Sequence, residues 1–310
     1  MHRLSKEEFA IFVHLIHDER TISELAEQIG RSRKRASALV LGLDRKGFVH
    51  RDRVGMVYRV SISSRTHAVM LKELMLRGLP VEKYLVDSRM DVAATLAMSR
   101  LPLRTRDIVE ITSMSPSAVR YSFKDLVRYG VVSRIGTRYH VSRSMDRLRQ
   151  FLVEHSIQHN QRVISELVDD GIIVWQLGFS FIFTSKHPVE MPNVHPTGVT
   201  AFTENGVELI GERFTYRCYS SPRALGLEDW VIDNILAHPH STTHMIYSLV
   251  FLKKNIDDVT PERLIELSRI YSLEDLGERM VGYVNGVDDP GLPPRNEFDE
   301  KYVMYGGQHG

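Results

Sequence analysis

Apolar residues recur at helical spacing three times within the first 46 residues of the chain. They predict helices over residues 5–18, 22–29 and 33–46. Each predicted helix follows a residue whose side chain is suited to capping it: Ser5, Thr21 and Ser32. Apolar and polar residues then alternate over 48–51 and 56–60, which predicts two strands around a hairpin tip at residues 53–55. Three helices followed by a hairpin form a winged helix-turn-helix module, to which we assign residues 1–65.

The same pattern returns 83 positions later, where Leu25 meets Ile108 and Gly47 meets Gly130. Four further pairs match at this offset: Ser32 with Ser115, Ala36 with Val119, Leu43 with Leu126, and Arg51 with Arg134. Past the hairpin tip the offset becomes 81, and three more pairs match: Gly55 with Gly136, Tyr58 with Tyr139, and Val60 with Val141. The pattern indicates a duplicated module with a two-residue deletion in the tip of its hairpin.

The second module covers residues 91–143. Its first helix is predicted over 91–100, Thr105 is expected to cap the second helix, and Ser115 and Pro116 supply the cap and the first-turn proline of the third. Residues 66–90 between the modules are assigned to a connecting helix or a dimerisation helix, whose apolar packing face ends at residues 78–80.

The pattern changes in the second half of the chain. A helix capped by Ser144 leads into β-branched and aromatic runs over 171–177 and 179–184, which predict buried strands. The remaining predictions are a loop over 188–196, a short helix over 197–205, a strand over 214–219, and helices over 227–236, 242–254, 260–271 and 273–285. Residues 144–285 are therefore expected to form a small mixed sheet followed by a helical bundle, and residues 286–310 an extended tail. The predicted fold class is α+β and predominantly α.

Charge divides the chain at about the same place. Residues 1–150 contain 28 lysines and arginines against 16 acidic residues, a net charge of +12, whereas residues 151–310 carry a net charge of −11. A basic surface attracts nucleic acid through contacts to phosphate, and an acidic surface is repelled by it. We therefore expect double-stranded DNA to contact only the first half.

The third helix of each module is the expected reader of DNA, and the hairpins are expected to contact its backbone. In the first module the candidates are Ser32, Arg33, Lys34, Arg35, Ser37, Arg51 and Arg53. In the second module, residues interpreted as occupying comparable places are Ser115, Ser117, Arg120, Tyr121, Lys124, Arg134 and Arg138. The alternative is a solvated helix face on a module that binds protein; basic charge on both copies favours DNA.

Other chemistry finds little support in the sequence. Three histidines, His238, His240 and His244, are weak candidates for a metal site, but Pro239 interrupts the helix that would align them. The single cysteine, Cys218, excludes an intrachain disulfide and is interpreted as a buried thiol. Glycine-rich phosphate loops and common hydrolase motifs are missing from the sequence, so we expect no enzyme activity and no cofactor.

The sequence lacks a signal-peptide pattern at residues 1–8 and any apolar run long enough to span a membrane, so we expect a cytoplasmic protein that does not associate with membranes.

Two family resemblances follow from these motifs. Residues 21–60 and 105–141 resemble tandem winged-helix transcription regulators of the MarR/ArsR type. In the second half, the runs 196–202, 219–222 and 227–229 resemble the C-terminal region of AbiEi-type antitoxins. The second resemblance implies repression of the protein's own operon and a toxin partner of the nucleotidyltransferase type.

Together these observations predict a DNA-binding transcriptional regulator, an autorepressor that acts as a homodimer. The competing hypothesis is an antitoxin or protein-interaction adaptor whose acidic C-terminal domain binds a toxin-like partner protein.

Overall fold

The computed structural model describes residues 2–207, 209, 213–219 and 223–306. The chain divides into two compact units, residues 1–159 and 160–310. It is an α+β protein with 54% helix and 15% strand, which confirms the predominantly helical class. No helix within the described residues is long and apolar enough to span a bilayer.

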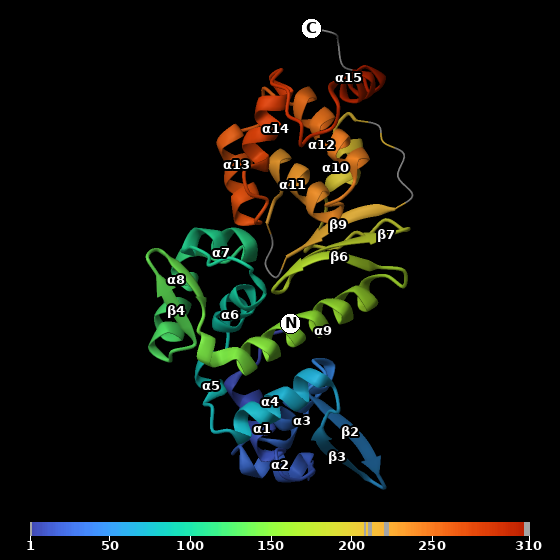
Figure 1. Ribbon diagram of the computed structural model, residues 1–310. Coiled ribbons are helices and arrows are strands. Elements are labelled where there is room, and N and C mark those ends of the chain that lie inside the picture. Colours follow the sequence, from blue (N-terminus) through green and yellow to red (C-terminus); the bar gives the residue numbers. More distant parts are fainter. Residues whose placement is uncertain (1, 208, 210–212, 220–222, 307–310) are drawn as a thin grey trace. The chain divides into compact units, whose positions relative to one another are not determined.

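The first unit begins with the predicted three helices and hairpin, which we call the first repeat. Its elements are α1 (Lys6–His14), β1 (Arg20–Thr21), α2 (Ile22–Gln28), α3 (Arg33–Arg45), β2 (Val49–Val54) and β3 (Val57–Ile62) (Figure 1). The predicted caps are confirmed, because the side chains of Ser5, Thr21 and Ser32 each accept a hydrogen bond from a backbone N–H of the following turn.

The second repeat has the same order of elements: α6 (Ser88–Met98), α7 (Thr105–Thr112), α8 (Pro116–Arg128), β4 (Val132–Ile135) and β5 (Arg138–Val141). Ser115 caps α8 and Pro116 opens it, as predicted. Thr105 does not cap α7. The cap position belongs to Arg104, whose backbone N–H donates to the Asp107 carboxylate at 2.7 Å, so an acidic side chain satisfies the helix start in place of the threonine hydroxyl.

Matched core positions explain why both copies fold alike. Leu25 and Ile108 are completely buried, as are Leu43 and Leu126. Each third helix ends at a glycine with positive φ, Gly47 at 76° and Gly130 at 69°. At both ends the next residue's N–H donates to a carbonyl of the last helical turn, Leu43 in one copy and Leu126 in the other. The matched apolar residues therefore occupy equivalent positions in the two repeats.

The strand register corrects the predicted deletion. Val49 pairs with Ile62 in the first hairpin and Val132 with Val141 in the second, so Val141 corresponds to Ile62 and not to Val60. The tips at Gly55 and Gly136 are equivalent. The second hairpin is therefore shorter by two residues in each strand, and the offset past the tip is 79 at the base of the hairpin.

A third strand position supports this register. In the first repeat, Arg20 of β1 pairs with Val60. In the second, Leu103 makes an isolated antiparallel bridge to Tyr139, with two backbone hydrogen bonds of 2.9 and 2.7 Å. Arg20 and Leu103 are related by the offset of 83, and Val60 and Tyr139 by 79. The resemblance between Tyr58 and Tyr139 in the sequence had concealed this alignment.

The connecting segment is not one helix. It forms α4 (Thr66–Leu76) and α5 (Val81–Tyr84) before α6 begins. The break lies at residues 78–80, where the predicted packing face ends, with Gly78 at a φ of 76° and Pro80 directly before α5. Ser144 is likewise not a helix cap, because it lies inside a short 3-10 helix, Arg143–Met145, that runs directly into α9 (Asp146–Leu167).

The second unit contains a four-stranded sheet in the order β6 (Ile172–Leu177), β7 (Ser180–Ser185), β9 (Phe214–Cys218), β8 (Val194–Pro196). Every pairing is antiparallel, so the predicted mixed sheet is wrong, and residues 194–196 form a strand where a loop was expected. The short strand β8 carries only three residues, too few for an alternating pattern to reveal it.

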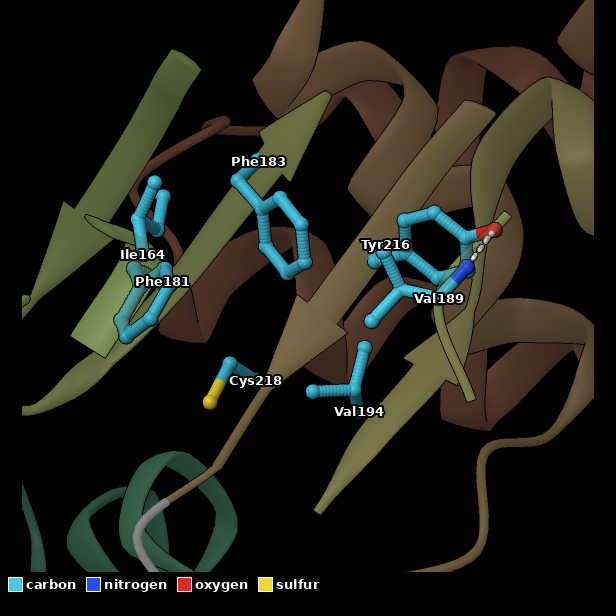
Figure 2. Close-up of a cluster of buried hydrophobic side chains, with 7 residues drawn as sticks. All are labelled: Ile164, Phe181, Phe183, Val189, Val194, Tyr216 and Cys218. Carbon is cyan, nitrogen blue, oxygen red and sulfur yellow. Dashed lines mark hydrogen bonds between the residues drawn. The ribbon is translucent and has the colours of Figure 1, made fainter. Parts of the chain in front are cut away.

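An apolar cluster covers one face of this sheet (Figure 2). It contains Ile164, Phe181, Phe183, Val189, Val194, Tyr216 and Cys218. The Tyr216 hydroxyl accepts a hydrogen bond of 3.0 Å from the Val189 backbone N–H, which satisfies a buried polar group at the edge of the cluster. Cys218 is buried here, so the predicted buried thiol is confirmed. Burial raises the pKa of this thiol to about 12.

The other helices described in the second unit are α10 (Gly198–Glu204), α11 (Leu227–Ala237), α12 (Thr242–Lys254), α13 (Pro261–Ile270), α14 (Leu276–Val284) and α15 (Arg295–Met304). The first five confirm the predicted helices. The sixth corrects the extended tail: Phe298 is buried against Tyr283, with ring centroids 5.4 Å apart, and anchors α15. Residues 307–310 of the tail, and 220–222 of the antitoxin-like run 219–222, lie outside the described residues.

Candidate nucleic-acid interface

The first turn of α3 presents three of the predicted cations. Arg33, Lys34 and Arg35 are all exposed, next to the exposed cap Ser32, whose Oγ accepts from the Arg35 backbone N–H at 3.2 Å. Ser37, one turn later, is partly buried. The beginning of α3 therefore carries the charge, and the helix becomes less polar toward its middle.

Carboxylates compensate much of this charge. Glu7 of α1 accepts hydrogen bonds from Arg35 and, at 2.7 Å, from Arg31. The hydrogen bonds from Arg35, and to a smaller extent from Arg31, hold the pKa of Glu7 below its ordinary value. On the hairpin, Arg51 pairs with Asp44 at 2.7 Å. Two of the predicted contact residues, Arg35 and Arg51, are therefore already engaged by acidic side chains.

Three of the cations predicted to contact DNA in the first repeat have no acidic partner among the described residues: Arg33, Lys34 and Arg53. The Arg53 Nε donates to the Gly55 carbonyl at 3.4 Å and lies at the hairpin tip. These three remain available to phosphate groups.

The second repeat places its charge differently, along the exposed face of α8. Arg120 and Lys124 are exposed, and Tyr121 beside them has 62% of its surface exposed. Ser115 and Ser117 at the helix start are also exposed, with their hydroxyl oxygens 3.1 Å apart. Residues four apart lie on the same side of a helix, so Arg120 and Lys124 form one basic stripe.

The second hairpin extends that stripe. The Arg134 Nε donates to the Gly136 carbonyl at 2.6 Å, and its guanidinium lies 5.8 Å from the Tyr139 ring centroid. Arg138 donates to the Pro102 carbonyl at 3.3 Å. Within the described residues, Arg120, Lys124, Arg134 and Arg138 form no ion pair with a carboxylate. Backbone carbonyls orient the two hairpin arginines and leave their positive charge uncompensated.

A hollow lies between α8 and the second hairpin. Phe123 and Tyr139 stack at its floor with ring centroids 3.8 Å apart, and Arg120, Lys124 and Arg134 surround them together with Thr105 and Val127. A neighbouring hollow shares Arg120 and adds Arg104 and Arg106 at the start of α7. None of the residues that line either hollow is acidic. An anionic group is the ligand that such a surface attracts.

The predicted DNA-contacting residues of α3 and α8 therefore do not occupy equivalent positions, contrary to the prediction. The offset of 83 places Arg33 and Lys34 at Pro116 and Ser117, in the first turn of α8. The positions in α3 that correspond to Arg120, Tyr121 and Lys124 are occupied by uncharged residues: Ser37, Ala38 and Leu41. Both helices carry several basic residues, but these lie in the first turn of α3 and farther along α8, so the two helices place their positive charge on different parts of the surface.

Comparison with known proteins adds nothing to these observations: neither a protein-family model nor a curated protein matches the chain.

Among the described residues, the three histidine candidates are not gathered into a group that could hold a metal ion. The rings of His238 and His244 stack with centroids 3.5 Å apart, an arrangement that packs ring faces together and does not direct two nitrogens at one ion. The His244 Nδ1 is 3.1 Å from the Asn234 Oδ1, and His240 is exposed. Burial lowers the pKa of both stacked rings, that of His244 to about 4. Among the described residues, no group of three or more potential ligands is assembled.

The second unit contains a buried charge cluster that the sequence did not indicate. Arg217 is completely buried, pairs with Asp233 at 2.7 Å, and lies 4.5 Å from the Trp175 ring centroid. Its Nη2 is 3.0 Å from the Tyr271 hydroxyl, and the Thr197 hydroxyl donates to Asp233 at 2.8 Å. These contacts join β9 to α11 through Asp233 and to the C-terminal end of α13 through Tyr271. They fix the interior of the unit and present no charge to a ligand.

Proposed function

We propose that this protein is a DNA-binding transcriptional regulator whose two repeats are winged helix-turn-helix modules. The order of three helices and a hairpin supports this assignment, as does the additional strand pairing between the second helix's start and the hairpin in both copies. In a module of this kind the third helix enters the major groove, whose width admits an α-helix. The proposal assigns the protein a binding role and no catalytic one.

The observation that carries the proposal is the uncompensated basic surface of the second repeat. Arg120, Lys124, Arg134 and Arg138 have no carboxylate partner among the described residues, and Tyr121 on α8 is exposed as well. An arginine or lysine on the third helix can bond guanine edges, and the hairpin arginines can bond phosphates. We therefore assign the principal DNA contact to the second repeat.

The first repeat contributes a smaller contact in this proposal. Arg33, Lys34 and Arg53 are suited to phosphate contacts, whereas Glu7 and Asp44 compensate Arg35 and Arg51. The acidic second half carries a net charge of −11 over residues 151–310 and is repelled by DNA phosphates, so the proposal assigns it no DNA contact. Two chains would bind paired half-sites, so the proposal includes a homodimer. It also includes repression of the protein's own gene, the expectation raised by the antitoxin-like runs of the sequence.

The test is binding of the purified protein to the DNA upstream of its own coding sequence and to a scrambled duplex of the same length, across a series of salt concentrations. The expected result is tighter binding to the upstream duplex and an affinity that falls steeply with salt. Equal, weak binding to both duplexes at low salt contradicts the proposal.

The acidic charge of residues 151–310 favours a second candidate function, an antitoxin or adaptor whose second unit binds a basic partner protein. Isolation of the protein in a stoichiometric complex that persists when Arg120 and Lys124 are replaced would support it. If replacing Arg120 and Lys124 removes the partner protein to the same extent as it removes DNA, the partner is held through DNA and this second candidate function is contradicted.

A further inference from the structure

The hairpin of the first repeat ends in exposed apolar side chains. Met56 has 93% of its surface exposed, Val54 51%, and Val57 41%. They lie together at the tip, since Val54 pairs with Val57 and the turn between them is Gly55 and Met56. We call these three side chains the apolar tip. Large apolar groups exposed together at the end of a projecting ribbon mark a site of contact with another molecule.

The second hairpin provides an internal comparison. The tip residues correspond by an offset of 81, which places Thr137 at Met56 and Arg138 at Val57. The first hairpin is also longer by two residues in each strand, which carries its tip about 7 Å farther from the base. Figure 1 shows β2 and β3 projecting beyond the helices of the first repeat. Val54 corresponds to Ile135, which is apolar and 63% exposed, so the two tips differ at the other two positions. Met56 and Val57 on the longer first hairpin are replaced by Thr137 and Arg138 on the shorter second one.

The charge on this hairpin favours DNA over a second copy of the chain as the molecule contacted. Arg53 lies next to the apolar tip without an acidic partner among the described residues, and its pairing partner across the ladder is Tyr58. The outer strand β2 carries His50, Arg51 and Asp52, and charged residues on an edge strand oppose its pairing with another strand. A cation beside apolar side chains is the combination that proteins insert into the minor groove.

Resting on the proposed function, we propose that the apolar tip inserts into the minor groove as a wedge and bends the duplex, with Arg53 on the adjoining phosphates. Apolar side chains that enter the minor groove partly unstack a base step and kink the helix by about 20 to 90°. The first repeat then recognises how easily a sequence deforms, and the second repeat recognises base edges through α8.

The bend is measured by energy transfer between dyes on the two ends of a duplex of about 30 base pairs from the upstream DNA. The wild-type protein is expected to shorten the distance between the ends. The variant M56T/V57R gives the first tip the chemistry of the second, and its added cation strengthens any contact that depends on phosphate alone. A wedge predicts that this variant binds without bending the duplex. A bend that persists in the variant overturns the proposal.

A second measurement uses the unmodified protein. Hydrogen peroxide converts exposed methionines to sulfoxides, and mass spectrometry follows Met56 against Met304, which is 65% exposed on α15. DNA is expected to protect Met56 severalfold and to leave Met304 unchanged. Equal oxidation of Met56 with and without bound DNA overturns the wedge. Protection of Met56 that appears without DNA as the protein concentration is raised reports self-association and also overturns the wedge. If the duplex does not bind at all, the proposed function fails together with the wedge; if it binds unbent with Met56 accessible, only the wedge fails.

Discussion

Replacing Arg120 and Lys124 with alanine is expected to remove two phosphate or base contacts and to reduce the salt dependence of DNA binding. Each cation that neutralises a phosphate contributes about 0.9 to the slope of log affinity against log salt, so the double variant should lower that slope by up to about 1.8, the full amount if both residues contact phosphate and less if either contacts a base edge. Between roughly 50 and 200 mM salt, the variant should therefore lose up to about tenfold less affinity than the wild-type protein. Both side chains are exposed and lack acidic partners among the described residues, so folding stability should change by less than about 0.5 kcal/mol for each.

The matched control is the double variant Arg31→Ala and Arg35→Ala, which removes the same formal charge from the first repeat. Glu7 already engages both arginines, so their loss should change the slope much less. The assay is fluorescence anisotropy of a labelled duplex over a salt series, with thermal unfolding as a check on the fold. Equal changes of slope in the two double variants would refute the reasoning that carboxylate compensation decides which cations bind DNA.

Three further predictions concern charge and burial. Glu7→Gln should release Arg31 and Arg35, strengthen DNA binding and, because one negative charge is removed, steepen the same slope by up to about 0.9; an unchanged slope would contradict this. Arg217→Met should cost about 3 to 5 kcal/mol in urea unfolding because it leaves Asp233 buried without its partner, and adding Asp233→Leu should recover part of the loss; a double variant weaker than the single one would contradict this. Burial, followed by the charges of His67 and His2, holds the pKa of His155 well below its ordinary value. The unfolded chain therefore takes up a proton at this residue as the pH falls below about 6.5, and stability should drop by up to about 1.4 kcal/mol per pH unit. His155→Phe should flatten this dependence when urea unfolding is repeated across a pH series, and an unchanged dependence would contradict the assignment to His155.

Local chemistry explains the successful sequence predictions. Ser5, Thr21, Ser32 and Ser115 cap helices by bonding to N–H groups within the next turn, so the signal lies within a few residues. The repeat was equally accessible, because the apolar positions that form its core recur at a fixed offset. The capping role expected of Thr105 failed for a local reason as well, since Asp107 competes for the same backbone group.

The errors arose where contacts span long stretches of chain. The strand directions of the second unit and the Arg217 to Asp233 pair depend on segments brought together only by folding. The ion pairs of Glu7 join residues 24 and 28 positions apart, so the sequence pattern presented Arg35 as an available cation. Phe298 follows a proline-containing stretch that predicts an extended tail, and only its contact with Tyr283 on a preceding helix buries it and anchors α15.

The candidate interface shows what divergence within a duplicated scaffold can achieve. Core positions of the two repeats remain apolar and buried at the same offset, which keeps the third helix and the hairpin in the same relation to one another within each repeat. Surface positions are free of that constraint, because replacing an exposed residue changes stability little. One copy consequently carries cations along the middle of its third helix, and the other carries an apolar tip on a longer hairpin. If both repeats contact one duplex, base recognition by α8 and deformation by the apolar tip add separate terms to the binding free energy. Specificity then depends on base identity at one place and on helix flexibility at another, so a single site must satisfy both.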